Sequence, residues 1–233
     1  MNRTKKLYDK GFKKFGLSFQ RSYPNEELCR FMGRNYFKMP FHKRKNIKIL
    51  EVGSGGGGNI WMISKEGFKT FGVDISDVSV RLLEKSLSKR KLKAKISIGD
   101  MTKLKFKDNT FDCIIDIFSS CSLNRKESFL FYKELGRVLK TKGKFFSYFP
   151  SKKSTMFKFK NKTLKDKDTI ISIKNKKAVF KLDNIPMRFL NKSEYIKILS
   201  GYNLKTYYSE ELIKTYFNGK ERFSFLVLEA LKI

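Results

Sequence analysis

The feature that most constrains the fold is a run of glycines directly after a short apolar stretch. Residues 47–53 read IKILEVG, and Gly55, Gly56, Gly57 and Gly58 follow at once. A short apolar run that ends in glycine is typical of a buried parallel strand. A glycine-rich turn between a first strand and a first helix lets a ligand approach the backbone, and the helix N-terminal amides point at that ligand. The segment therefore predicts an α/β protein with a ligand site at the end of its first strand.

Strand and helix patterns alternate along the next hundred residues. The expected strands are residues 47–53, 68–74, 94–100, 111–117 and 144–149, and the expected helices are residues 59–66, 76–87 and 126–140. This alternation predicts right-handed crossovers and a parallel sheet. Near the end of the chain, Asn218-Gly219 lies between two strand-like runs, which is a strong hairpin signal. We therefore expect the sheet to finish with an antiparallel pair.

The chain has 233 residues, which is enough for one domain with a full hydrophobic core. We expect a single domain over residues 1–233 with four parts. These are a helical cap at residues 1–45, a ligand-binding core at 46–150, an insertion or substrate flap at 151–190, and a terminal helix and β-hairpin at 191–233. The insertion is expected to hold a small hairpin around residues 175–177. Because the sheet serves the ligand, substrate selection is expected in the cap and the insertion.

The formal net charge of +30 is the most marked bulk property. One interpretation is attraction to phosphates, in nucleic acid, on an anionic membrane surface or in a phosphorylated substrate. The other is compositional drift, since the excess is mostly lysine and is spread along the chain. Arginine is the residue favoured where a phosphate is recognised through two hydrogen bonds. Both interpretations stay open.

Several classes of protein are not expected. No run of 18 apolar residues exists, so we expect no transmembrane helix, and the basic N-terminus has no apolar segment of a secretory signal. Cys29, Cys113 and Cys121 are scattered, and His42 is the single histidine. This usage predicts no metal site and no disulfide framework, and it indicates a reduced, cytoplasmic compartment.

Glu51 restricts the kind of ligand. The glycines alone fit the dinucleotide pattern GxGxxG through Gly53, Gly55 and Gly58, which is a weak signal. A carboxylate two residues before the first glycine would repel a pyrophosphate. It suits a ligand that carries an ammonium group and a sulfonium and has no phosphate, such as S-adenosylmethionine.

The segment ILEVGSGGGG resembles motif I of the class I S-adenosylmethionine-dependent methyltransferases. FDCIIDIF (111–118) resembles motif IV, and ELGRVLKTKGKFFSYFP (134–150) is similar to the segment that follows it. In that segment Thr141 and Lys142 replace the usual proline and glycine, a change confined to a surface turn. The resemblance covers residues 47–150 and implies S-adenosylmethionine as cofactor. It also implies a Rossmann-like, doubly wound sheet of seven strands in the order 3-2-1-4-5-7-6, mostly parallel with an antiparallel last strand.

The resemblance also implies which residues bind the cofactor. Asp74 would accept the ribose hydroxyls, Asp100 would contact the adenine amino group with Met101 against the ring, and Asp116 with Ile117 would lie beside the methionine part. The full expected set is Glu51, Gly53, Ser54, Gly55, Gly57, Asp74, Ile75, Asp100, Met101, Asp116 and Ile117. Three alternatives stay open: Asp74 as a helix cap, Asp100 as a solvated acid, and Asp116 as a strand-end carboxylate held by backbone amides.

The methyl acceptor is harder to predict. The fourth expected strand is followed by Ser119-Ser120-Cys121-Ser122 and not by an Asn-Pro-Pro-Tyr sequence, so no catalytic residue is assigned. His42 as a base and Tyr23 and Tyr36 as acceptor-pocket residues are hypotheses only. The favoured function is methyl transfer to an oxygen or nitrogen atom of a small molecule or glycan. The alternatives are an RNA methyltransferase, a SAM-binding interaction protein without turnover, and an NAD-dependent oxidoreductase, which Glu51 argues against. The oligomeric state is left open.

Overall fold

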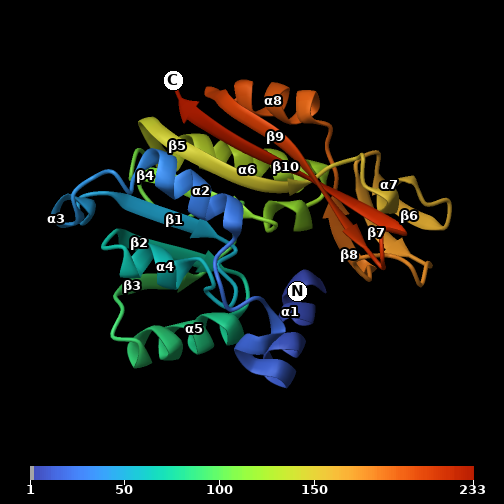
Figure 1. Ribbon diagram of the computed structural model, residues 1–233, viewed down its shortest axis with the longest axis horizontal. Coiled ribbons are helices and arrows are strands. Elements are labelled where there is room, and N and C mark those ends of the chain that lie inside the picture. Colours follow the sequence, from blue (N-terminus) through green and yellow to red (C-terminus); the bar gives the residue numbers. More distant parts are fainter. Residues whose placement is uncertain (1–2) are drawn as a thin grey trace.

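A central sheet of seven strands organises the computed structural model, which describes residues 3–233. The strand order is β3-β2-β1-β4-β5-β10-β9 (Figure 1). The bounds are β1 Lys48–Val52, β2 Lys69–Asp74, β3 Ala94–Ile98, β4 Phe111–Ile117, β5 Leu139–Pro150, β9 Leu204–Tyr216 and β10 Glu221–Lys232. Strand β10 runs opposite to the other six strands of this sheet, so its pairs with β5 and β9 are antiparallel and all other pairs are parallel. Because β9 and β10 are its sixth and seventh strands in chain order, the predicted order 3-2-1-4-5-7-6 is confirmed.

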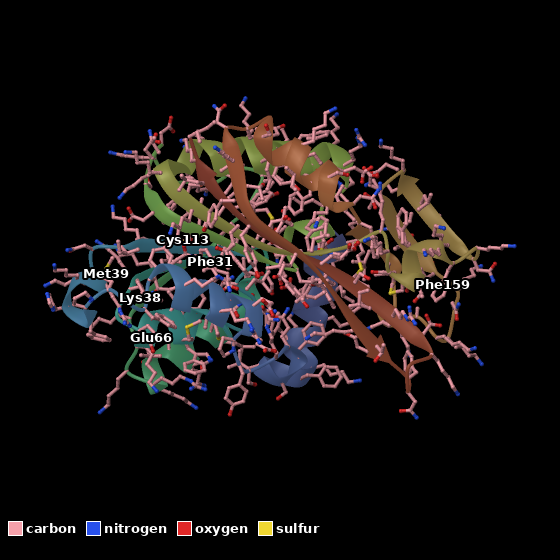
Figure 2. All side chains as sticks on the ribbon, turned by 45° about the horizontal axis from the view of Figure 1, so that its top comes forward. Phe31, Lys38, Met39, Glu66, Cys113 and Phe159 are labelled. Carbon is pink, nitrogen blue, oxygen red and sulfur yellow. The ribbon has the colours of Figure 1, made fainter. Side chains whose placement is uncertain are left out.

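Helices cover both faces of the sheet, because its central strands are apolar on both sides. In β4, Cys113 and Ile115 pack on one face and Ile114 on the other, as the two-residue period of a strand requires. Helices α2 (Glu26–Asn35) and α4 (Ile60–Lys65) pack on the first face, and α6 (Arg125–Val138) and α8 (Lys192–Ser200) pack on the second. Figure 2 shows Phe31 of α2 in the interior near Cys113.

Local capping explains where several helices begin. The side chain of Asn25 accepts hydrogen bonds from the backbone amides of Glu27 and Leu28, at 2.9 and 3.2 Å, which starts α2. Asn191 and Glu194 form a capping box at the start of α8. The remaining helix of the core, α5 (Asp77–Lys89), begins after the Ser76 cap.

A helical cap precedes the sheet, as predicted. It consists of α1 (Arg3–Phe15), the 3₁₀ helix η1 (Gly16–Phe19), α2 and the short α3 (Phe41–Arg44). Helix α1 lies near α5 (Figure 1), and Lys5 forms an ion pair with Asp77 of α5. The Ser76 hydroxyl donates to Asp9 Oδ1 at 2.6 Å. These contacts hold α1 against the carboxyl end of β2.

The segment between β5 and α8 forms a second, smaller sheet in the order β6-β7-β8, all antiparallel. Its elements are α7 (Thr155–Lys158), β6 (Lys162–Asp166), β7 (Thr169–Ile173) and β8 (Asp183–Arg188). The predicted hairpin around residues 175–177 is therefore wrong in its second strand. Residues 178–182 form no strand, because Ala178 and Leu182 pack into the core cluster that also contains Met156 and Phe189. Across residues 3–233, no helix combines the length and apolarity needed to cross a membrane.

Candidate functional site

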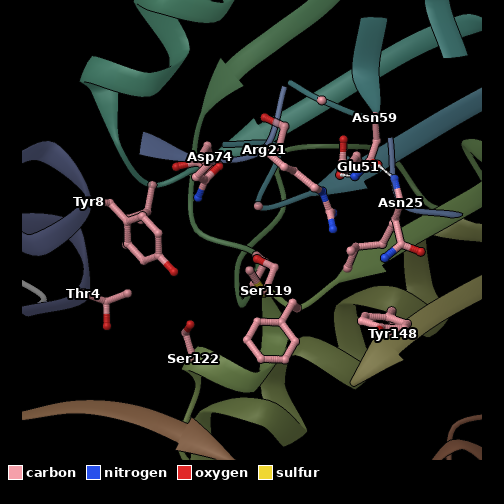
Figure 3. Close-up of a pocket in the computed structure, with 18 of the residues that line it drawn as sticks. Thr4, Tyr8, Arg21, Asn25, Glu51, Asn59, Asp74, Ser119, Ser122 and Tyr148 are labelled. Carbon is pink, nitrogen blue, oxygen red and sulfur yellow. Dashed lines mark hydrogen bonds between the residues drawn. The ribbon is translucent and has the colours of Figure 1, made fainter. Parts of the chain in front are cut away.

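A cavity of about 460 Å³ opens at the carboxyl ends of the parallel strands (Figure 3). The glycine-rich turn and the ends of β1, β2 and β4 form its floor, while the cap and the terminal hairpin contribute its sides. Open α/β sheets bind ligands in this crevice because the strand order reverses there. The volume lies within the range of roughly 300–1,000 Å³ that small-molecule sites have.

The turn after β1 requires glycine. Gly53, Gly55 and Gly57 have φ values of +66°, +48° and +79°, in the left-handed region that disfavours other residues. A Cβ atom on Gly53 would also overlap the Ser119 side chain, and one on Gly57 would overlap Leu83. The turn therefore brings the backbone close to the cavity without side chains in the way.

Glu51 at the end of β1 has an unsatisfied carboxylate oxygen. Glu51 is 3% exposed, and its Oε1 atom accepts a hydrogen bond from Asn59 Nδ2 at 2.5 Å. Its Oε2 atom is buried and has no hydrogen-bond partner among residues 3–233. Burial raises the pKa of Glu51 to about 8. A buried acceptor without a donor costs free energy, so this atom is suited to a ligand that brings N–H groups into the cavity.

Asn59 connects Glu51 to the cap. While its side-chain nitrogen donates to Glu51, its Oδ1 atom accepts a hydrogen bond from the backbone amide of Asn25 at 2.9 Å. Figure 3 shows the three side chains grouped at one end of the cavity. The start of α2 thus fixes the orientation of the carboxylate at the end of β1.

Asp74 at the end of β2 faces the cavity and also organises the turn. Its Oδ2 atom accepts from the Gly55 amide at 2.7 Å, and its Oδ1 atom accepts from the Ser76 amide at 2.8 Å. Burial raises its pKa above the ordinary value for an aspartate. The cap of α5 is Ser76, so Asp74 supports the helix start without being its N-cap residue.

Asp100, after β3, lines the cavity but is exposed to solvent. Its Oδ1 atom accepts from the amide and the hydroxyl of Thr102, both at 2.8 Å. Met101 lies beside it on the cavity surface. The site thus combines an acid and an apolar side chain at the outer strand β3.

The structure brings most of the predicted cofactor residues to this cavity. The ones that line it are Glu51, Gly53, Ser54, Asp74, Ile75, Asp100, Met101 and Ile117. Three predicted residues are not on the cavity surface: Gly55, Gly57 and Asp116. The two glycines belong to the turn but do not line the cavity, and the Gly55 amide donates a hydrogen bond to Asp74.

Asp116 at the end of β4 is fully buried and does not line the cavity. Its Oδ1 atom accepts from the Ser120 amide at 2.9 Å, and its Oδ2 atom accepts from the Ser120 hydroxyl. Burial raises its pKa to about 6. The contacts correspond to the alternative interpretation, a strand-end carboxylate held by the following backbone, so direct contact with a cofactor is not supported.

The cap supplies cavity residues that the sequence pattern did not indicate, including Tyr8, Gln20 and Arg21. Gln20 Oε1 accepts from the Gly56 amide at 3.0 Å, which joins the cap to the glycine turn. These contacts join residues more than 30 positions apart, so no local pattern announces them. The other cap hypotheses are not supported, because none of the following side chains lines the cavity: Tyr23, Tyr36 and His42.

Comparison with known proteins agrees with this geometry. Residues 49–143 match the protein family described as "Methyltransferase domain". The sterol 24-C-methyltransferase of Kluyveromyces lactis is 29% identical over 135 residues, which are 56% of this chain and 36% of that protein. The norajmaline N-methyltransferase of Rauvolfia serpentina is 31% identical over 116 residues, 48% of this chain and 38% of that protein. The chain therefore spans less than two fifths of the length of these relatives.

The fold is also shared with solved structures. A SAM-dependent methyltransferase from Methanosarcina mazei superposes with a TM-score of 0.68 at 19% identity, covering 80% of this chain and 92% of that one. Residues 49–143 therefore match a methyltransferase domain, and the chain has the Rossmann-like fold that it shares with this solved S-adenosylmethionine-dependent methyltransferase.

Proposed function

We propose that this chain binds S-adenosylmethionine in the cavity and transfers its methyl group to an oxygen or nitrogen atom of a small molecule. The observation that carries the proposal is the buried Oε2 atom of Glu51, which has no donor within residues 3–233. The cofactor's ammonium group would supply that donor, and its charge would offset the burial of the carboxylate. A dinucleotide would bring a pyrophosphate instead, which a carboxylate at this place repels.

Other cavity residues suit the remaining parts of the cofactor. Asp74 would accept the ribose hydroxyls, since each of its oxygens keeps a second lone pair besides its backbone hydrogen bond. Asp100 and Met101 suit the adenine amino group and ring. Gly53 and Ser54 would present backbone to the methionine part. S-adenosylmethionine supplies an already activated methyl group, so the protein has mainly to bind and orient.

The chain's own residues maintain that orientation. Asn59 holds Glu51, the Gly55 amide holds Asp74, and Gln20 fixes the cap on the glycine turn. These hydrogen bonds come from the cap, the glycine turn and the residue that precedes α4, and they fix both acids relative to the turn. The cap also excludes water from the carboxylate end, which strengthens charge interactions there.

A small-molecule acceptor is favoured over nucleic acid. The cavity of about 460 Å³ must accommodate both the cofactor and the reacting part of the acceptor. The two curated relatives are named for a sterol and for norajmaline, not for a nucleic acid or a protein. The hydrogen-bond partners of Glu51 and Asp74 within residues 3–233 include no lysine or arginine. The excess of basic residues therefore takes no part in holding these two acids.

Calorimetric titration with S-adenosylmethionine and S-adenosylhomocysteine tests the cofactor. We expect Glu51→Gln to weaken both ligands roughly 10- to 150-fold, since a hydrogen bond to a charged group is lost. The matched control is Glu84→Gln, an exposed residue of α5 that should leave affinity unchanged. Equal affinity in wild type and Glu51→Gln, or tighter binding of NAD than of either sulfur compound, would refute the proposal. Tight binding with no S-adenosylhomocysteine formed across a broad acceptor panel would instead indicate a binding protein without turnover.

A further inference from the structure

Five aromatic side chains line the part of the cavity that lies away from Glu51 and Asp74, and we call them the aromatic wall. They are Phe118, Tyr148, Phe180, Tyr216 and Phe225. The ring centroids of Phe118 and Phe180 are 5.2 Å apart, and Tyr148 stacks on Phe225 at 4.6 Å. Phe118 joins these two pairs, since its ring centroid is 5.7 Å from that of Phe225, so four of the five rings form one connected apolar surface.

The sheet order separates this wall from the acids of the cavity. Glu51, Asp74 and Asp100 stand at the ends of β1, β2 and β3, which form one side of the sheet. The wall comes from the end of β4, from β5, β9 and β10 on the other side, and from the connection between β7 and β8. The cofactor residues and the aromatic wall thus form two opposed parts of one cavity.

The charges divide in the same way. All carboxylates that line the cavity lie on the β1–β3 side, and no histidine lines it. The cations that line it are Arg21 and Lys214, and neither forms an ion pair among residues 3–233. Arg21 extends toward Glu51 (Figure 3) and lowers its pKa from a distance. Lys214 of β9 lies at the edge of the aromatic wall. Its charge helps to lower the pKa of Glu26, but the two side chains form no ion pair within residues 3–233.

We propose that the acceptor is a flat, largely apolar molecule with an anionic oxygen, either an aromatic carboxylate or a phenolate. Its ring lies against the aromatic wall and its charge faces Lys214. This inference rests on the proposed function, because it concerns the second substrate of the same cavity. It narrows the acceptor atom from oxygen or nitrogen to an ionised oxygen.

Two observations select an ionised oxygen: the wall has no base to deprotonate a neutral hydroxyl or an ammonium group, and the charge of Lys214 favours an anion over a neutral amine, which needs no base either. A neutral hydroxyl or a protonated amine must lose a proton before or during transfer. The wall's own titratable groups are the phenols of Tyr148 and Tyr216, and burial raises the pKa of both, so neither is an anion that accepts a proton at neutral pH. An ionised oxygen needs no base. Its lone pair forms the bond to the methyl carbon while the carbon–sulfur bond pair passes to sulfur, so the negative and positive charges cancel and no proton moves.

A pair of probes with nearly the same rings tests this inference without relying on turnover. The probes are 1-anilinonaphthalene-8-sulfonate, which is anionic, and N-phenyl-1-naphthylamine, which lacks the sulfonate. Each is titrated by fluorescence into the protein loaded with S-adenosylhomocysteine. We expect the anion to bind more tightly, Lys214→Met to weaken the anion alone by roughly 2- to 5-fold, and Phe180→Ala to weaken both probes.

Two matched variants control for the basic surface and for exposed rings. Lys205→Met removes another exposed lysine of β9 that is not in the cavity, and Phe217→Ala removes a ring that is 54% exposed. Both should leave the two probes unchanged. The inference is overturned if Lys205→Met and Lys214→Met weaken the anion equally, or if the neutral probe binds as tightly as the anion. A wild-type protein that fails to bind S-adenosylhomocysteine in calorimetry would overturn the proposed function itself, which keeps the two failures apart.

Turnover provides the second arm of the test. Formation of S-adenosylhomocysteine is measured with 1-hydroxy-2-naphthoate and with 1-naphthylamine, which share the naphthalene ring. We expect product from the anion, and less product with Lys214→Met. Methylation of the amine at an equal or higher rate would overturn the inference.

Discussion

The protonation state of Glu51 affects both the folding stability of the protein and the binding of the proposed cofactor. Burial raises the pKa of Glu51 to about 8, so the ligand-free carboxyl is mostly protonated at neutral pH. In an unfolded chain it would ionise near pH 4.5, the ordinary value. Between these two values the folded state holds the extra proton, so this group's contribution to stability falls as the pH rises toward 8. An ammonium ion beside Oε2 reverses the preference and favours the carboxylate.

This gives a prediction for the pH dependence of binding. Because the cofactor's ammonium lowers the pKa of Glu51, binding between pH 6 and 7.5 should release a proton, and affinity should rise with pH in that window. Calorimetry at pH 6.5 in two buffers of different ionisation enthalpy measures the number of protons released, and we expect nearly one per S-adenosylmethionine. In Glu51→Gln the release should disappear. Proton uptake in the wild type would contradict the assignment of this residue to the ammonium group.

The sequence allowed the strand-end acids to be predicted but not all of their roles. Glu51 and Asp74 follow strands whose apolar pattern is local, so their place at the rim could be inferred from the residues around them. Asp116 has the same local pattern. The difference lies in the turn that follows β4, where the amide and hydroxyl of Ser120 donate hydrogen bonds to the Asp116 carboxylate. No sequence pattern reveals the direction in which that turn folds.

At the scale of elements, α1 controls one side of the cavity. Thr4 and Tyr8 line the cavity from this helix, while Asp9 accepts from Ser76 and pairs with Lys5. The indole nitrogen of Trp61 donates to the Ser22 carbonyl at 3.0 Å, just beyond η1. As Trp61 is the chain's single tryptophan, its fluorescence should report on movement of the cap.

We therefore predict that Asp9→Ala speeds the release of S-adenosylhomocysteine by roughly 2- to 10-fold, the range expected when one or two modest hydrogen bonds are lost. Stopped-flow dilution with tryptophan fluorescence measures the rate. The control is Glu84→Ala on the exposed face of α5, which leaves the tether to α1 intact. An unchanged release rate in Asp9→Ala would show that α1 does not limit the exit of the ligand.

Elements with a strict period were predictable, and elements without one were not. The apolar pattern of β4 is local, and the strand is present at residues 111–117 as predicted. The caps of α2 and α8 are local too, since each is made by an asparagine at the helix start. Strand β6 is mostly exposed and carries no apolar alternation. Residues 178–182 have an apolar composition typical of a strand, but packing against Met156 uses those side chains in an irregular segment. Only the tertiary contacts distinguish these two cases.

At the scale of the whole molecule, the net charge of +30 acts on every part of the structure. The strand order was predicted from the resemblance to the class I methyltransferases, while the alternation of strands and helices indicated only a parallel sheet. The role of the net charge could not be predicted, because the positions of lysines along a sequence do not show how those lysines are grouped on the folded surface. Figure 2 shows nitrogen-tipped side chains around the whole outline of the molecule. Such a distribution produces self-repulsion that opposes the compact state, whether or not a polyanion binds.

Screening that repulsion should stabilise the protein. Raising NaCl from 10 to 150 mM shortens the Debye length from about 30 to about 8 Å. That length is still longer than the 2.6 Å ion pairs at Asp9 and Asp168. Long-range repulsion should therefore weaken more than the close attractions. Since 1 kcal/mol corresponds to about 2–4 °C for a chain of this size, we expect Tm to rise by several degrees in a thermal scan. A neutral solute at equal osmolality should not reproduce the rise, and a fall in Tm would mean that the close ion pairs, not the excess of lysine, dominate the electrostatic free energy of folding.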